Sequence, residues 1–126
     1  MTTNVLYAQI QWSGGEHKFS LPMHDEWPLR HGLNDPYPRL KRILDGEWTV
    51  IDVVEVVRAG LIGGRAFKAA DPALTLMVRD HVEKRPLAEG AALAKAILMA
   101  AVFGIPAEIA DKPQSAIEVL ELVGGV

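Results

Sequence analysis

The 126-residue sequence predicts a mostly helical α+β fold, in which an N-terminal β-hairpin at about residues 5–21 packs on a bundle of four to six helices. Three observations lead to this prediction. Apolar and polar residues alternate through the hairpin segment, as in half-buried strands. Charged residues recur at every third position of segment 49–64, which gathers them on one side of a helix. The Ala-rich segment 87–103 is apolar nearly all round, as in a helix surrounded by protein.

Composition excludes several classes of function. The formal net charge of −3 offers no electrostatic basis for binding nucleic acid, and the absence of cysteine excludes disulfides, thiolate zinc sites and cysteine nucleophiles. Lys95, Gly104 and Pro106 interrupt the most apolar run, 91–107, so a buried helix is expected there and no membrane span. No signal peptide is apparent, so we expect a cytoplasmic protein. The length of the chain predicts one domain over residues 1–126.

The hairpin segment places its apolar residues on one face. A two-residue turn at Gly14-Gly15 predicts three pairs on that face: Trp12 with His17, Ile10 with Phe19, and Ala8 with Leu21. Because a lone hairpin is only marginally stable in water, this face is expected to lie on the helices.

Two helices are expected before the centre of the chain. A short helix at 24–33, capped by Asp25, is restricted by Pro28. Asp35-Pro36 has the pattern of an N-cap followed by a proline in the first turn, and predicts a helix through Leu44. The basic residues of this second helix are expected on a solvated face: Arg39, Lys41 and Arg42.

The central helix is predicted at about residues 50–60. Thr49 and Asp52 form a capping box at its start, and Gly60 or Gly63 can end it. Its charged stripe comprises Asp52, Glu55 and Arg58. The remaining residues are apolar and must be covered by neighbours on two sides: Val50, Ile51, Val53, Val54, Val56, Val57 and Leu61.

Two further helices are expected to complete the core. Asp71-Pro72 repeats the pattern of a cap followed by proline and opens the first of them. Its buried stripe comprises Leu74, Met77, Val78 and Val82, with His81 at the margin. The second is Leu87–Phe103, which Gly104 and Pro106 end.

A last helix is predicted from Lys112. It carries Ile117, Leu120 and Val123 at helical spacing, and Gly124-Gly125 stops it. Together with Trp27, whose side-chain type is favoured at binding hot spots, the Ile117/Leu120 face is the candidate partner interface.

The candidate chemical sites are weak. His24 and His31 are seven residues apart, but Pro28 lies between them and no ligand spacing such as HExxH is present. The glycine-rich segment 60–65 follows a helix and lacks the phosphate-loop pattern GxxxxGK[ST], so helix capping is the better interpretation. With no catalytic arrangement and no cofactor motif, the sequence predicts a protein that is not an enzyme and uses no cofactor.

Five segments in order resemble the gene transfer agent family of small phage-tail proteins, which is grouped with the tail assembly chaperones. They are IQWSGGEHKFSL at 10–21, RILDGEW at 42–48, DVVEVVRAGLIGG at 52–64, RPLAE at 85–89 and AILMAAVFG at 96–104. The resemblance covers about residues 8–104. It leaves a C-terminal helical extension at about 105–126, and segment 23–38 departs from the family pattern.

The resemblance implies a non-enzymatic role in a prophage or gene transfer agent. A chaperone of this kind would bind the long helical tape-measure protein, the tail tube protein, or both, in the cytoplasm of the bacterial host. The alternative is a structural, tube-associated component in the tail of a virion-like particle, which could self-associate. A small metal-binding protein that uses His24 and His31 ranks third. Neither nucleic acid nor membrane is an expected partner.

Overall fold

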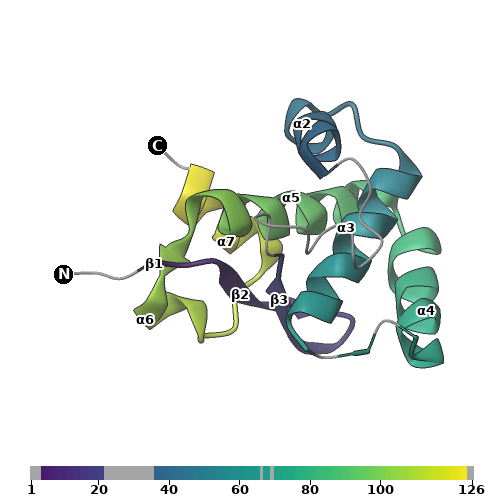
Figure 1. The fold of residues 1–126 in the computed structure, drawn as a ribbon, viewed down its shortest axis with the longest axis horizontal. Coiled ribbons are helices and arrows are strands. Elements are labelled where there is room, and N and C mark those ends of the chain that lie inside the picture. The colour runs from purple at the N-terminus through teal and green to yellow at the C-terminus, as the bar shows by residue number, and fades with distance from the viewer. Residues whose placement is uncertain (1–3, 22–35, 66, 69, 125–126) are drawn as a thin grey trace.

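A computed structural model describes residues 4–21, 36–65, 67–68 and 70–124 (Figure 1). Its elements, in chain order, are β1 (Asn4–Val5), β2 (Tyr7–Trp12), β3 (Gly15–Ser20), α2 (Pro36–Asp45), α3 (Val50–Gly63), α4 (Pro72–Val78), the π-helical turn η1 (Arg79–Glu83), α5 (Leu87–Phe103), β4 (Ile105–Pro106), α6 (Ala107–Ala110) and α7 (Ala116–Gly124). The predicted class, a mostly helical α+β fold with an N-terminal hairpin, is confirmed. The predicted helix at 24–33 falls outside the described residues.

The β2–β3 hairpin has a different register from the predicted one. Trp12 pairs with Gly15, and Ile10 with His17, so the predicted pairing of Trp12 with His17 is wrong by two residues. The turn is formed by Ser13 and Gly14, whose φ angles of 58° and 74° are both positive, as the tightest hairpin turn requires. A shift of two residues keeps every side chain on its predicted face, because side chains alternate along a strand. The inward face is therefore still apolar.

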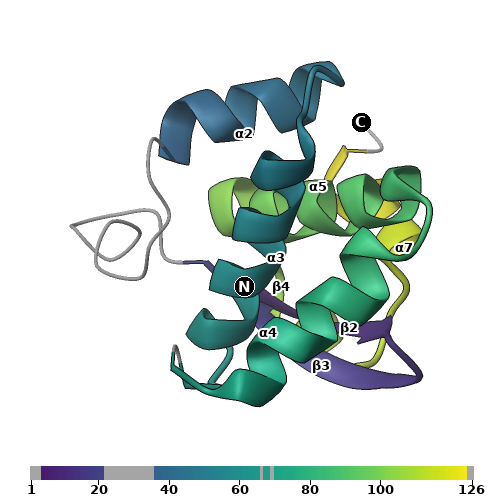
Figure 2. The same cartoon turned by 90° about the vertical axis from the view of Figure 1, so that its right-hand side faces the viewer.

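Helix α3 lies at the centre of the described fold, between α4 and α5 and against β3 (Figure 2). The predicted capping box is present: the Asp52 amide donates to Thr49 Oγ1, and the Thr49 amide donates to Asp52 Oδ2. The helix runs to Gly63, beyond the predicted end near residue 60, because Leu61 and Ile62 are buried in the core.

The first turn of α3 corrects one prediction. Val50 and Ile51 were expected to be covered, but both are exposed, Ile51 by 63%. Ile51 lies about half a turn around the helix from the arc of buried residues, since each residue advances by about 100°. That arc comprises Asp52, Val53, Val56, Val57, Ala59, Gly60 and Leu61, and Ile62 is also buried, about three turns further along the helix than Ile51.

The remaining predicted core helices are confirmed. Asp71 caps α4 by accepting a hydrogen bond from the Ala73 amide, and α5 has the predicted bounds. Glycines permit the close approach of α3 to α5. A Cβ on Gly90 would lie 3.0 Å from Val53 Cγ1, and a Cβ on Gly60 would lie 3.2 Å from Ile97 Cγ2.

The segment after α5 folds back along the molecule. β4 pairs with β1, and α6 is a single turn that leads to Gln114. Gln114 lies beside β2 as an extended residue, which delays the start of α7 from the predicted Lys112 to Ala116. Ser115 and Glu118 cap the helix reciprocally: the Glu118 amide donates to Ser115 Oγ, and the Ser115 amide donates to Glu118 Oε1.

Replacing Ser115 with alanine is expected to lower the free energy of unfolding of α7 by about 1 kcal/mol, the usual value of such a cap. Native-state hydrogen exchange of the α7 amides measures this loss. Glu121→Ala, on the exposed side of the same helix, is the matched control and should leave the exchange rates nearly unchanged. Equal exchange in wild type and Ser115→Ala would contradict the capping role.

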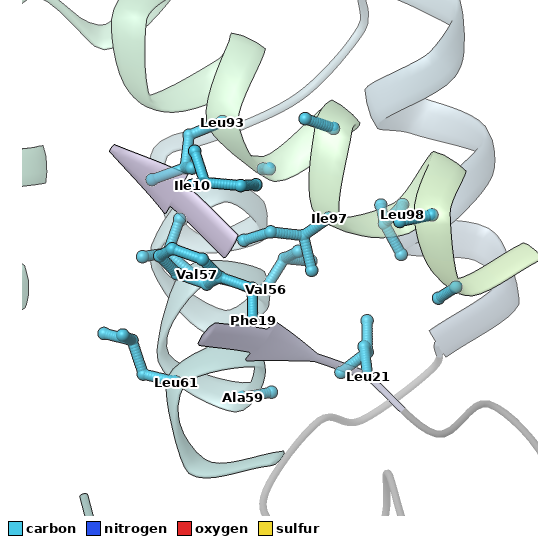
Figure 3. Close-up of a cluster of buried hydrophobic side chains, with 14 of the residues drawn as sticks. Ile10, Phe19, Leu21, Val56, Val57, Ala59, Leu61, Leu93, Ile97 and Leu98 are labelled. Atoms are coloured by element: carbon cyan, nitrogen blue, oxygen red, sulfur yellow. The ribbon is translucent and has the colours of Figure 1, made fainter. Parts of the chain in front are cut away.

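The core lies where the hairpin meets α3 and α5. Figure 3 shows Ile10 and Phe19 from the hairpin directed toward Val56 and Val57 of α3 and Ile97 of α5. All of these side chains are essentially inaccessible to solvent. Within the described residues, no single helix is long and apolar enough to span a membrane; α4–η1 and α5 reach that length only as a pair bent by 119°.

Candidate protein-interaction site

The predicted interface residues differ in their surroundings. Ile117 projects from α7 and is 56% exposed, whereas Leu120 is half-buried and packs against the core. Trp27 lies outside the described residues, as do His24 and His31. Among the predicted interface residues that the structure describes, Ile117 is therefore the exposed one.

Helix α7 packs along α5 (Figure 1), and Ile117, Glu118, Glu121 and Leu122 are exposed to solvent. Val119 is its fully buried side chain, and Ala116, Leu120 and Val123 are partly buried against the core. On the outer side, Leu122 is 42% exposed. An exposed leucine on a helix is ordinary by itself, so its meaning depends on the surface around it.

A groove of about 510 Å³ lies beside the exposed side of α7, and we call it the α7 groove. It is lined by Ile109, Lys112, Pro113, Gln114, Glu118, Glu121 and Leu122. Ile109, Pro113 and Leu122 supply apolar surface, and two glutamates and one lysine supply charge. The groove therefore combines apolar surface with mainly acidic charge. Such a surface suits the binding of a segment in which basic residues flank an apolar one.

Gln114 anchors one wall of the α7 groove. Its backbone amide donates to the Gln9 carbonyl (3.1 Å), and its carbonyl accepts from the Gln11 amide (2.7 Å). Its side-chain Nε2 donates to the Ile109 carbonyl at 3.0 Å. Sequence reasoning missed Ile109, Pro113 and Gln114, because a single extended residue between two short helices has no periodic pattern.

Both outer edges of the β2–β3 hairpin are occupied. Gln114 takes the hydrogen-bonding positions of Gln9 and Gln11 on β2. On β3, the end of α3 lies so close that a Cβ on Gly64 would overlap the Lys18 carbonyl group. An incoming strand would need such positions free to extend the sheet. Strand addition at these positions is therefore blocked.

An ion cluster around the buried Asp52 carboxylate joins α2 to the start of α3. Arg42 donates to both oxygens of Asp52 at 2.8 and 2.7 Å, and Arg39 donates to Oδ1 at 2.9 Å. The predicted solvated face holds for Lys41, which is exposed, and only in part for Arg42, whose side chain is 38% exposed; it is wrong for Arg39, at 13%. The partner of the two arginines is ten to thirteen residues away, so the periodicity of the helix alone could not indicate it.

The ion cluster predicts a pH-dependent stability. The hydrogen bonds from Arg42 lower the pKa of Asp52 from 3.8 to about 2, against the opposing effect of burial. Because the folded pKa is lower than the unfolded one, the stabilisation is present at neutral pH and is lost as the pH falls from about 5 to 2. A shift of this size corresponds to about 2 kcal/mol.

The stability difference between wild type and Asp52→Asn measures this effect, because contributions from other carboxyl groups cancel. Urea unfolding at pH 7 and at pH 2.5 should show the difference shrinking by about 2 kcal/mol on acidification. A difference that is the same at both pH values would contradict the assigned role of Asp52.

An aromatic cluster lies on the inward face of the hairpin, at the end next to the turn. The ring of Trp12 meets the rings of His17 and His81 edge-on, each at 5.8 Å between centroids. Burial lowers the pKa of His17. Among the described residues, no group of three His, Asp or Glu side chains could hold a metal ion.

These features define the class of the chain as a small helical α+β protein whose hairpin is closed at both edges and lies on a central helix. The family model described as phage tail tube protein, GTA-gp10, matches residues 7–104, so the chain belongs to that family of phage and gene transfer agent tail proteins. The match begins at β2, ends after α5 and leaves α6 and α7 outside. No curated protein and no solved structure matches the chain.

Proposed function

We propose that this tail protein is an assembly chaperone, which binds a helical segment of another tail component through the α7 groove and releases it when the tail is complete. The observation that carries the proposal is the apolar surface of the groove, where Leu122 is exposed beside Ile109 and Pro113. The proposal includes no catalysis and no cofactor. The protein would act in the cytoplasm of the bacterial host.

The lining of the groove favours a partner of defined chemistry. An amphipathic helix could place an apolar side chain on Ile109, Pro113 and Leu122. Lysine or arginine residues beside it would face Glu118 and Glu121, where opposite charges favour the correct register and speed association. The tape-measure protein, which the family resemblance implies to be long and helical, can offer many such segments. The tail tube protein is the other candidate partner.

A structural role in the tail is the second candidate function, because the description of the matching family names a tail tube protein. The two functions differ in whether the chain stays in the particle. Purified tails should contain the chain in stoichiometric amount if it is a tube-associated component, and should lack it if it is a chaperone. Quantitative mass spectrometry of purified particles and of the soluble fraction distinguishes the two.

Replacing Leu122 with aspartate is expected to weaken binding of the tail partner at least tenfold, because a charge would be buried where an apolar side chain was covered. Stability should change by less than about 0.5 kcal/mol, since Leu122 is exposed in the free chain. Titration of the partner, followed by fluorescence anisotropy, measures the affinity.

Leu76→Asp on α4 is the matched control for Leu122→Asp. Leu76 is 48% exposed, so the same substitution is made at a similar exposure but on another helix. The proposal expects this variant to bind like wild type. Equal loss of binding in both variants, or loss in neither, would show that the α7 groove is not the binding surface.

A further inference from the structure

The charges that line the α7 groove differ in sign between its two sides. Lys112 lies on segment 109–114, which forms one side, and Glu118 and Glu121 lie on α7, which forms the other. We propose that Lys112 is a specificity-determining residue of the groove, and that it selects a partner helix whose apolar stripe has an acidic flank as well as a basic one. The inference rests on the proposed function and goes beyond it by assigning that acidic flank.

The α7 side of the groove combines acidic charge with an apolar residue. Glu118, Glu121 and Leu122 follow the spacing i, i+3, i+4, which places them on one face of the helix, and all three are exposed. The cap of α7 fixes the position of the first carboxylate, because Glu118 Oε1 accepts a hydrogen bond of 3.0 Å from the Ser115 amide. The basic flank of a bound helix therefore fits beside α7.

The opposite side of the groove carries positive charge at Lys112, which is exposed. None of the ion pairs found among the described residues includes Lys112. The neighbouring carboxylate, that of Asp111, lies outside the groove lining and accepts a hydrogen bond of 2.9 Å from the Tyr7 hydroxyl of β2. Because the hairpin holds Asp111, Lys112 can pair with an acidic residue of a bound helix.

Both sides of the groove also supply apolar surface, with Ile109 and Pro113 on one and Leu122 on the other. A helix that buries its apolar stripe there turns one flank toward Lys112 and the other toward α7. If both flanks were basic, a like charge would lie beside Lys112 whichever way the helix ran, and like charges across an interface lower affinity. Lys112 therefore disfavours helices that the acidic side alone would accept, which is how a binding site gains specificity.

Titration of the full chain with two designed helical peptides, followed by fluorescence anisotropy, tests the role of Lys112. Both peptides carry the same leucine stripe; the first has glutamate on one flank and lysine on the other, and the second has lysine on both. Wild type should bind the first about fivefold more tightly, which is the effect of one exposed ion pair. Lys112→Glu should reverse this preference. Lys41→Glu, at an exposed residue of α2, changes the net charge equally and should keep the wild-type preference.

Equal affinity of wild type for the two peptides overturns the inference, as does binding of neither. An unchanged preference in Lys112→Glu also overturns it, and so does a reversal that Lys41→Glu produces as well, because net charge would then explain the effect. Leu122→Asp separates failure of the inference from failure of the proposed function. If this variant loses both peptides while wild type binds them equally, the α7 groove is still the binding surface, and the role assigned to Lys112 alone is wrong.

Discussion

Replacing Asp52 with asparagine is expected to lower the free energy of unfolding by about 3 kcal/mol at pH 7, because the buried charge of the ion cluster is removed while the arginines remain. Asp52 is 1% exposed and accepts hydrogen bonds from Arg39, Arg42 and the Thr49 amide. Asparagine keeps one oxygen that can accept the Thr49 bond, so the substitution mainly reports the lost charge. Urea unfolding followed by circular dichroism measures the effect.

Asp45→Asn is the control for this prediction, because Asp45 is an exposed carboxylate at the end of α2. Its loss should change stability by less than about 0.5 kcal/mol. If Asp52→Asn were no more destabilising than Asp45→Asn, the cluster would not hold α2 against α3, and the contacts of Arg39 and Arg42 would be incidental.

Replacing Gly64 with alanine is expected to cost about 3 kcal/mol or more, because the new methyl group would overlap the Lys18 carbonyl group of β3. The methyl carbon is fixed directly to Cα and the Lys18 carbonyl group is backbone, so no side-chain rotation can relieve the overlap. The φ angle of Gly64 is −75°, which alanine adopts without strain. The loss therefore comes from forcing the hairpin away from the end of α3, and thermal unfolding should show it as a lower Tm.

Gly15→Ala is the matched control in the same hairpin. A Cβ on Gly15 would have His17 Nε2 as its nearest neighbour, at 3.8 Å, which is an ordinary contact. This variant should unfold near the wild-type temperature. If Gly64→Ala were equally harmless, the hairpin would have room to move, and the closed edge of β3 would lose its physical basis.

Sequence reasoning succeeded where the cause of a feature lies in residues that are close together in the chain. Helix α5 was predicted with both ends correct, because its segment is apolar nearly all round and Gly104 and Pro106 end it. The capping box of α3 was predicted because both partners lie within four residues. The hairpin register was missed because Ser13 took the left-handed conformation that a glycine was expected to supply.

The features that sequence reasoning missed depend on contacts between different elements of the fold. The pairing of Arg42 with Asp52 joins two helices, and the pairing of Gln114 with β2 spans more than 100 residues. The Ile117/Leu120 face was identified as a candidate interface, and the structure leaves Ile117 exposed. Leu122 and the turn at 109–114 were not identified, because the α7 groove exists only after this turn has packed beside α7.

The most direct test of the proposed chaperone function is co-purification of the chain with the tape-measure protein of the same phage or gene transfer agent, after co-expression. The account predicts a soluble complex with wild type and with Leu76→Asp, and its loss with Leu122→Asp. Tape-measure protein that is soluble without the chain and never co-purifies with it would contradict the account.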